Sequence, residues 1–267
     1  VRAATRRSMR AGAEEVETPA RGHVLLWPDT FTEHLSPAVG QAAVRVLEAA
    51  GLGVLPVLPA MRRIGKPVCC GLTYVSTGQL DRAREVMRRT LDEMSKLPGT
   101  GVVPIVVLEP SCAAALRTDL PELLPDDPRA LRLAASVLTF AEALERLAPD
   151  WTPPHINRPA VGQTHCHQHA VLGDAPDRRL REAAGLTGEL AGGCCGLAGN
   201  FGFEQGHYEV SAACAEEQLL PAVRQAPEGT VVLADGFSCR TQLEQLAGVR
   251  GRHLAEVLAE ALEADGQ

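Results

Sequence analysis

Short apolar runs alternate with longer amphipathic stretches along the chain from residue 23 onward. The short runs have the length of buried strands, and the longer stretches repeat their apolar positions every three or four residues, as helices do. We expect strands over residues 23–27, 54–58, 104–108, 160–164 and 230–234, and residues 187–190 lead to the segment 192–196. We expect helices over residues 37–50, 79–96, 113–124, 130–147, 178–184, 208–223 and 252–263.

Strands that alternate with helices of this length predict an α/β fold with parallel sheets and helices on both faces. The order occurs twice, so we expect two pseudo-repeated Rossmann-like halves, residues 22–148 and 160–267. A linker with four prolines, residues 149–159, separates them. Residues 1–21 are short of apolar side chains, and we interpret them as a disordered tail or as the cut end of a longer protein.

Two details of the helices can also be predicted. Ser36, with Pro37 behind it, is expected to cap the first helix through its side chain. Leu80 is expected on the inner side of the second.

Two cysteine doublets, Cys69-Cys70-Gly71 and Cys194-Cys195-Gly196, stand out from this background. Each is followed at a similar distance by a Ser-Cys pair, which ends in Cys112 in the first half and in Cys239 in the second. Adjacent thiols fill a core poorly, whereas they can hold a metal or carry out redox chemistry. The repeated spacing makes inert burial of both doublets, the usual state of a free cysteine, the weaker interpretation.

The predicted strands place these cysteines together. Cys112, Cys166 and Cys239 each follow an apolar strand, and ligands of open parallel sheets lie beyond the carboxyl ends of the strands. We therefore predict one site per half. The first half carries Asp29-Thr30 where the second carries Cys166, which leaves its site with three thiols and one position for a carboxylate, water or substrate, or leaves it empty.

The second site offers Cys166, Cys194, Cys195 and Cys239, with His165, His167 and His169 close by. Four thiolates suit an iron–sulfur cluster, and a mixture of Cys and His suits zinc, so both remain open. We expect at most one of the histidines to be a ligand. A redox disulfide or a nucleophilic thiol ranks below metal binding, because a disulfide between neighbouring residues strains the peptide between them.

Other motifs carry weaker signals. The glycines at 193, 196, 199 and 202 match neither a P-loop nor a dinucleotide fingerprint. Glu204 and His207 could line the second site or cap the helix that follows, and Cys214 alone on its helix is expected to be an inert thiol.

The charge and the cysteine content of the sequence disfavour some kinds of function and favour others. The 267 residues carry a formal net charge of −7, which disfavours a nucleic-acid surface. Eight cysteines without a signal peptide or an apolar run of spanning length favour metal or redox work in the cytoplasm, with peripheral association at the inner face of the membrane as an option.

The doublets, together with Leu108-Glu109-Pro110-Ser111-Cys112 and Ala234-Asp235-Gly236-Phe237-Ser238-Cys239, resemble paired cysteine-rich "CCG" domains. Such domains occur in one subunit of heterodisulfide reductase, in the iron–sulfur subunits of glycolate oxidase and anaerobic glycerol-3-phosphate dehydrogenase, and at the end of FAD-linked D-lactate or D-2-hydroxyglutarate dehydrogenases. The resemblance spans about residues 22–260 and is closest to the last group, through the segments 27–31, 165–167 and 194–204. Glu109 and Gly236 replace the first cysteine of a Cys-x-x-Cys ending, a departure from the heterodisulfide reductase pattern.

The resemblance implies an electron-transfer module with a 4Fe-4S cluster in the second repeat, held by Cys166, Cys194, Cys195 and Cys239. Cys69, Cys70 and Cys112 are the corresponding candidates in the first repeat. The implied partners are an FAD-containing dehydrogenase for a 2-hydroxy acid, because no FAD segment is recognisable in this sequence, and a ferredoxin-like iron–sulfur domain. A zinc-binding or metal-free docking module and a thiol-based disulfide reductase are the alternatives.

Overall fold

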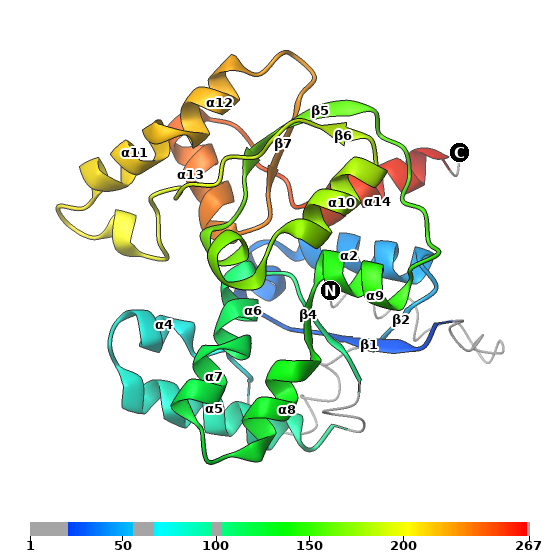
Figure 1. Cartoon of the computed structure of the whole chain (residues 1–267). Helices are drawn as coiled ribbons and strands as arrows, with labels where there is room; N and C mark the ends of the chain where they lie inside the picture. The colour runs from blue at the N-terminus through cyan, green and yellow to red at the C-terminus, as the bar shows by residue number, and fades with distance from the viewer. Residues whose placement is uncertain (1–20, 56–66, 98–102, 266–267) are drawn as a thin grey trace. The chain divides into compact units, whose positions relative to one another are not determined.

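The computed structural model of the protein describes residues 21–55, 67–97 and 103–265. The chain forms two compact units, residues 1–151 and 152–267, and the boundary lies inside the proline-rich segment. Figure 1 shows the course of the chain through both units. The tail expected at residues 1–21 lies outside the described residues except for Arg21, and so does the part of the second expected strand beyond residue 55.

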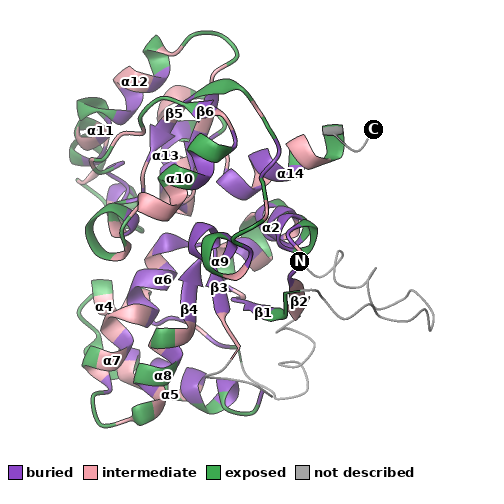
Figure 2. Ribbon diagram, turned by 45° about the vertical axis from the view of Figure 1, so that its right-hand side comes forward, coloured by how far each residue is buried: buried purple, intermediate pink, exposed green. Residues whose placement is uncertain are grey.

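The first unit is built on a parallel sheet with the strand order β2-β1-β3-β4. Its strands are β1 (His23–Leu26), β2 (Gly53–Leu55), β3 (Ile105–Val107) and β4 (Val137–Thr139). Val24, Ile105 and Val106 have no exposed surface, so the two central strands form the core of this unit. Figure 2 shows β3 and β4 as buried ribbons.

Helices fill the connections of the first unit. Pro37 and Pro110 each occupy a first-turn position, where a missing N–H is tolerated. The helices are η1 (Phe31–Leu35), α2 (Pro37–Ala49), α4 (Leu72–Ser76), α5 (Leu80–Met94), α6 (Pro110–Arg117), α7 (Asp119–Leu123), α8 (Pro128–Ser136) and α9 (Phe140–Leu147).

The continuous helix expected over residues 130–147 is wrong, because β4 interrupts it. Thr139 ends the strand and starts α9 through a capping box, in which its hydroxyl accepts from the N–H of Glu142 while the Glu142 carboxylate accepts from the N–H of Thr139. The Glu142 carboxylate also forms an ion pair with Arg117 of α6, and Arg117 donates to the carbonyl of Val137 in β4, so this arginine links α9 to the sheet.

The second unit has a smaller parallel sheet with the order β6-β5-β7. Its strands are β5 (Arg158–Gln163), β6 (Leu186–Thr187) and β7 (Val231–Ala234). Its helices are η2 (Gln168–Leu172), α10 (Ala175–Ala183), η3 (Phe201–Phe203), α11 (Tyr208–Glu217), α12 (Leu219–Gln225), α13 (Phe237–Ala247) and α14 (Leu254–Asp265). The expected helix over residues 208–223 divides at Gln218, and α13 was not expected.

The two units repeat one arrangement. In each, the first strand lies between the second and the third, and a five-residue π-helix, η1 or η2, follows that first strand. The predicted α/β class with two parallel, Rossmann-like halves is confirmed. β4 continues the first sheet beyond β3, and at the corresponding edge of β7 the second unit has a single parallel bridge, between Leu233 and Arg252.

Two local expectations are wrong. The side chain of Ser36 forms no capping hydrogen bond at the start of α2. Leu80, expected on the buried side of α5, is 41% exposed because it is the first residue of that helix. In the described part of the chain, every helix is too short or too polar to span a membrane.

Candidate metal centre

The second doublet lies in the loop between β6 and η3, and the end of β7 brings Cys239 to it. Cys195 and Cys239 are buried in one small core cluster with Leu197, Leu219 and Leu243. Cys239 is the third residue of α13, the helix that follows β7 after a short turn. Cys194 is exposed, so this group has one face in the core and one face open to solvent.

The three thiols influence one another's ionisation. The bond with Cys194 lowers the pKa of the Cys195 thiol, but the bond with Cys239 and burial outweigh it and raise that pKa to about 12. The bond with Cys195 and partial burial also raise the pKa of Cys194. Without a cation Cys194 and Cys195 are therefore neutral thiols at neutral pH, and a metal bound to them would have to displace their protons.

Gly196 sets the backbone conformation directly after the second doublet. Its φ of +87° lies in the left-handed region, and its N–H points at the Cys194 sulfur at 3.3 Å. Gly71 has the same conformation in the first unit, with a φ of +83° and its N–H at 3.5 Å from the Cys69 sulfur. In both units a backbone N–H thus faces the first sulfur of the doublet, as is favourable for a thiolate.

Gln163, at the end of β5, fixes the backbone that leads into the second doublet. Its side-chain nitrogen donates to the carbonyls of Thr164, Ala191 and Gly193 at 2.8–2.9 Å. The residue is 2% exposed, and its Oε1 has no hydrogen-bond partner among the described residues. Sequence reasoning missed Gln163, since a glutamine at a strand end matches no motif.

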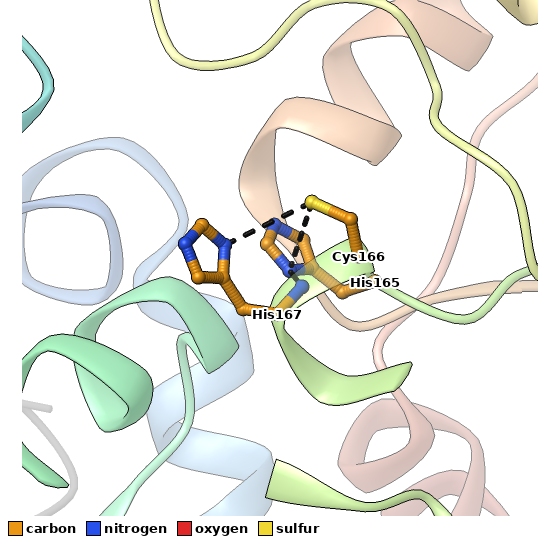
Figure 3. Close-up of side chains that lie close together, drawn as sticks. All are labelled: His165, Cys166 and His167. Atoms are coloured by element: carbon orange, nitrogen blue, oxygen red, sulfur yellow. Dashed lines mark hydrogen bonds between the residues drawn. The ribbon is translucent and has the colours of Figure 1, made fainter. Parts of the chain in front are cut away.

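Cys166 differs from the other three candidate cysteines of the second unit in its surroundings. It follows β5, is exposed, and contacts the rings on either side of it: its sulfur is 4.0 Å from Nδ1 of His165 and 3.8 Å from Nδ1 of His167. These three ligand atoms lie within 4.8 Å of one another, as Figure 3 shows. The backbone N–H of His167 donates to Nδ1 of His165 at 3.1 Å, which leaves Nε2 to carry the proton of a neutral His165 ring.

The first unit assembles Cys69, Cys70 and Cys112 in the same way. Cys70 and Cys112 are buried with their sulfurs 3.2 Å apart, and Cys112 lies in the first turn of α6, directly beyond β3. The bond with Cys112 and burial raise the pKa of Cys70 well above its ordinary value. The structure thus brings together each doublet and its distal cysteine, and it brings Cys166 together with His165 and His167.

The remaining candidates have local roles. Nδ1 of His207 lies 3.2 Å from a carboxylate oxygen of Glu204, and the His207 ring stacks on Phe201; no side-chain hydrogen bond caps α11. Cys214 is half-buried, and its Cβ would lie 3.1 Å from a Cβ added at Gly196. It therefore lies directly against the doublet loop, which its isolated sequence position did not indicate.

The cysteine thiols of the two units are ligands of the kind that bind iron–sulfur clusters and zinc. Each unit offers three neighbouring thiols at strand ends and a backbone N–H directed at sulfur, features that fit an iron–sulfur cluster or a zinc ion. The fold and these sites together define a cysteine-rich α/β protein with two related repeats.

Comparisons with known proteins agree with this class. Residues 30–117 match the family model of the cysteine-rich domain, CCG, which confirms the resemblance inferred from the doublets. The chain is 28% identical over 248 residues to a subunit of anaerobic glycerol-3-phosphate dehydrogenase from Escherichia coli strain K12, covering 91% of this chain and 60% of that protein.

Two further relatives differ from each other in how much of their length this chain covers. D-2-hydroxyglutarate dehydrogenase of Escherichia coli strain K12 is 27% identical over 243 residues, covering 90% of this chain and 23% of that enzyme. Lactate utilization protein A of Exiguobacterium sp. is 26% identical over 257 residues, covering 90% of this chain and 98% of that protein. The chain thus spans about three fifths of the first relative and about a quarter of the second.

Proposed function

We propose that the chain is the iron–sulfur electron-transfer module of an FAD-linked dehydrogenase for a 2-hydroxy acid of the D-lactate, D-2-hydroxyglutarate or glycolate type. Cys166, Cys194, Cys195 and Cys239 would hold a 4Fe-4S cluster. The observation that carries this proposal is the burial of Cys195 and Cys239 in one core cluster while the adjacent Cys194 is open to solvent. The names of two relatives, a subunit of anaerobic glycerol-3-phosphate dehydrogenase and D-2-hydroxyglutarate dehydrogenase, support a dehydrogenase partner, and that of lactate utilization protein A supports a 2-hydroxy acid.

A cluster bound there would accept and release single electrons, and the residues of this chain would govern its surroundings. The N–H of Gly196 faces the Cys194 sulfur and favours its thiolate. Leu197, Leu219 and Leu243 exclude water from the side of Cys195 and Cys239. The open side at Cys194 and Cys166 would face the electron donor, a flavin or a ferredoxin-like domain of the partner.

The first experiment compares wild-type protein with Cys195→Ser and Cys214→Ser after anaerobic purification. We expect the wild type to contain iron and acid-labile sulfide and to give a cluster signal in electron paramagnetic resonance after reduction. Cys195→Ser should lose that signal, while Cys214→Ser, a conservative change beside the same loop, should keep it. Absence of iron and sulfide from the wild type overturns the proposal, and loss of the signal in Cys214→Ser overturns the four-cysteine ligand set.

The second experiment tests the dehydrogenase. The protein would be purified together with an FAD dehydrogenase from the same source, and the cluster absorbance followed after separate additions of D-lactate, D-2-hydroxyglutarate, glycolate and glycerol 3-phosphate. We expect bleaching by a 2-hydroxy acid and none by the same acid without the dehydrogenase. Bleaching by glycerol 3-phosphate alone contradicts the substrate class but keeps electron transfer.

A zinc-binding docking module is the second candidate, and the group His165, Cys166 and His167 favours it. Two imidazole nitrogens and one sulfur within 4.8 Å of one another form a donor set typical of zinc. Stoichiometric zinc in place of iron in the second unit, lost in His167→Ala but kept in His169→Ala, would support this candidate.

A further inference from the structure

The two repeats place equivalent helices beside their doublets. In the first unit, a Cβ added at Gly71 would lie 3.7 Å from the carbonyl oxygen of Ala83 in α5. In the second unit, a Cβ added at Gly196 would meet the carbonyl oxygen of Ser211 in α11 at 2.0 Å. Ala83 and Ser211 therefore occupy corresponding positions, and the residues that follow them can be compared one by one.

The correspondence continues along both helices. Thr90, seven residues further along α5, accepts a hydrogen bond from the N–H of Cys69 at 3.0 Å and donates one to the Cys69 carbonyl at 2.8 Å. Gln218, the equivalent residue at the end of α11, has its side chain 3.5 Å from a Cβ added at Gly193. In both units this residue lies against the start of the doublet loop.

One residue earlier, the two helices carry opposite charges. α5 has Arg89 there, and α11 has Glu217. The neighbouring thiol and burial raise the pKa of Cys69, and the positive charge of Arg89 opposes them. The neighbouring thiol and burial also raise the pKa of Cys194, but the negative charge of Glu217 adds to their effect. The second doublet thus has an anion beside it where the first has a cation.

The whole segment around the second doublet is acidic. Between Arg181 and Arg224 the sequence has six glutamates and no Asp, Lys or Arg. Glu216 pairs with Arg224, whereas Glu209 and Glu217 form no ion pair within the described part of the chain. All six side chains are exposed to solvent: Glu182, Glu189, Glu204, Glu209, Glu216 and Glu217.

One face of α11 is open. Val210 and Glu217 are exposed and lie two helical turns apart on the same side of the helix. Cys214 lies between them and against the doublet loop, so this face continues to the exposed Cys194. Phe203, in the short helix η3 before α11, is also more than half exposed. Figure 2 shows exposed residues along α11.

We propose that Phe203, Glu209, Val210 and Glu217 form the docking surface for an electron-transfer protein or domain that presents Lys and Arg around an apolar centre. The inference rests on the electron-transfer function proposed above and adds the chemistry of the partner's surface. Opposite charges accelerate the encounter of two proteins and orient them. A partner on this face would lie beside Cys194, at the open side of the second site.

The charges also decide against other occupants of this face. A second copy of the chain would bring glutamates against glutamates, and nucleic acid or an anionic membrane would bring phosphates against them. A basic partner would meet Arg89 at the equivalent position of the first unit. The charge at this position therefore directs such a partner to the second doublet.

Docking is tested first without electron transfer, on the full chain, with zinc-substituted cytochrome c as a basic protein probe. At low ionic strength, Glu209→Lys/Glu217→Lys should weaken binding about tenfold more than Glu228→Lys/Glu244→Lys does. The control pair is exposed, lies before β7 and on α13, and changes the net charge equally. Carbodiimide cross-links to the lysines of the probe should map to Glu209 and Glu217 and not to Glu228 and Glu244.

The FAD dehydrogenase then replaces the probe. With the cluster present, the Glu209→Lys/Glu217→Lys protein should be reduced by the dehydrogenase and its 2-hydroxy acid about tenfold more slowly than the control pair. Dithionite, which needs no docking surface, should reduce both proteins completely, and their iron and sulfide contents should be equal. Added salt should slow the reduction of the wild type and remove the difference between the variants.

Three results would overturn the docking surface: equal losses of binding in the two double variants, cross-links that favour Glu228 or Glu244, or an unchanged rate of reduction by the dehydrogenase in Glu209→Lys/Glu217→Lys. Failure of the electron-transfer proposal reads differently, since it would show as absence of iron from the wild type while the difference in binding to the zinc probe persisted.

Discussion

The ring of His165 lies directly over the backbone of Gly236: a Cβ added at Gly236 would come within 2.0 Å of the His165 Cδ2 atom. Gly236 has an ordinary φ of −74°, so an alanine there would meet a steric obstacle and no backbone strain. The contact joins the end of β5 to the turn that carries Cys239. The first unit has Glu109 at the corresponding position, three residues before Cys112, where the second unit has this glycine.

Gly236→Ala should therefore displace His165 and destabilise the protein by about 1–3 kcal/mol, the usual range for an overpacked core. Chemical denaturation followed by circular dichroism would measure this. In a His165→Ala background the same substitution should cost much less, because the ring is gone. An equal loss in both backgrounds would show that the ring is not the obstacle.

Gly196→Ala should be more damaging than Gly71→Ala. Both positions have a φ near +85°, but a Cβ at Gly196 would meet the carbonyl oxygen of Ser211 at 2.0 Å, whereas at Gly71 it meets the flexible Met87 side chain at 3.2 Å. We expect roughly 1–2 kcal/mol from the backbone conformation in each, with a further loss only at Gly196.

Gly78→Ala provides the control for that comparison, because its φ is +72° and no atom of the described residues lies within 4 Å of the added Cβ. Melting temperatures of the three variants should fall in the order Gly196→Ala lowest, then Gly71→Ala, with Gly78→Ala at or above the latter. A Gly71→Ala protein as unstable as Gly196→Ala would contradict the difference between the two loops.

Gln163→Leu should make the backbone that leads into the second doublet less well ordered. It removes three donated hydrogen bonds, leaves the carbonyls of Ala191 and Gly193 without this partner, and should destabilise the protein by about 1–3 kcal/mol. Iron content and the reduced-cluster spectrum should change as well. Gln225→Leu, a substitution at the last residue of α12, is a control expected to leave both unchanged. An altered melting temperature with an unaltered spectrum would limit Gln163 to a structural role.

Alkylation of the metal-free protein would test the pKa of Cys195. With a pKa of about 12 the thiol is neutral at pH 7–9, and its reactive thiolate fraction rises tenfold with each pH unit across that window. The rate of modification by iodoacetamide, followed by mass spectrometry of the Cys195 peptide, should therefore keep rising without a plateau near pH 8.5. A plateau there would mean that the bond with Cys239 and burial do not govern this thiol.

The sequence patterns predicted the parallel sheets and the meeting of each doublet with its distal cysteine, because strand ends in such sheets share one edge. They did not reveal β4, since Val137-Leu138-Thr139 continues the helical spacing on both sides. The capping box of Thr139 and Glu142 was a readable signal of that break. Gln163 and the contact between Cys214 and Gly196 depend on tertiary packing, which leaves no local pattern.

One hydroxyl, that of Thr90, saturates both backbone groups of Cys69. Because Thr90 belongs to α5, that helix holds the backbone of the first doublet in place, and the order of this loop does not depend on a bound ion.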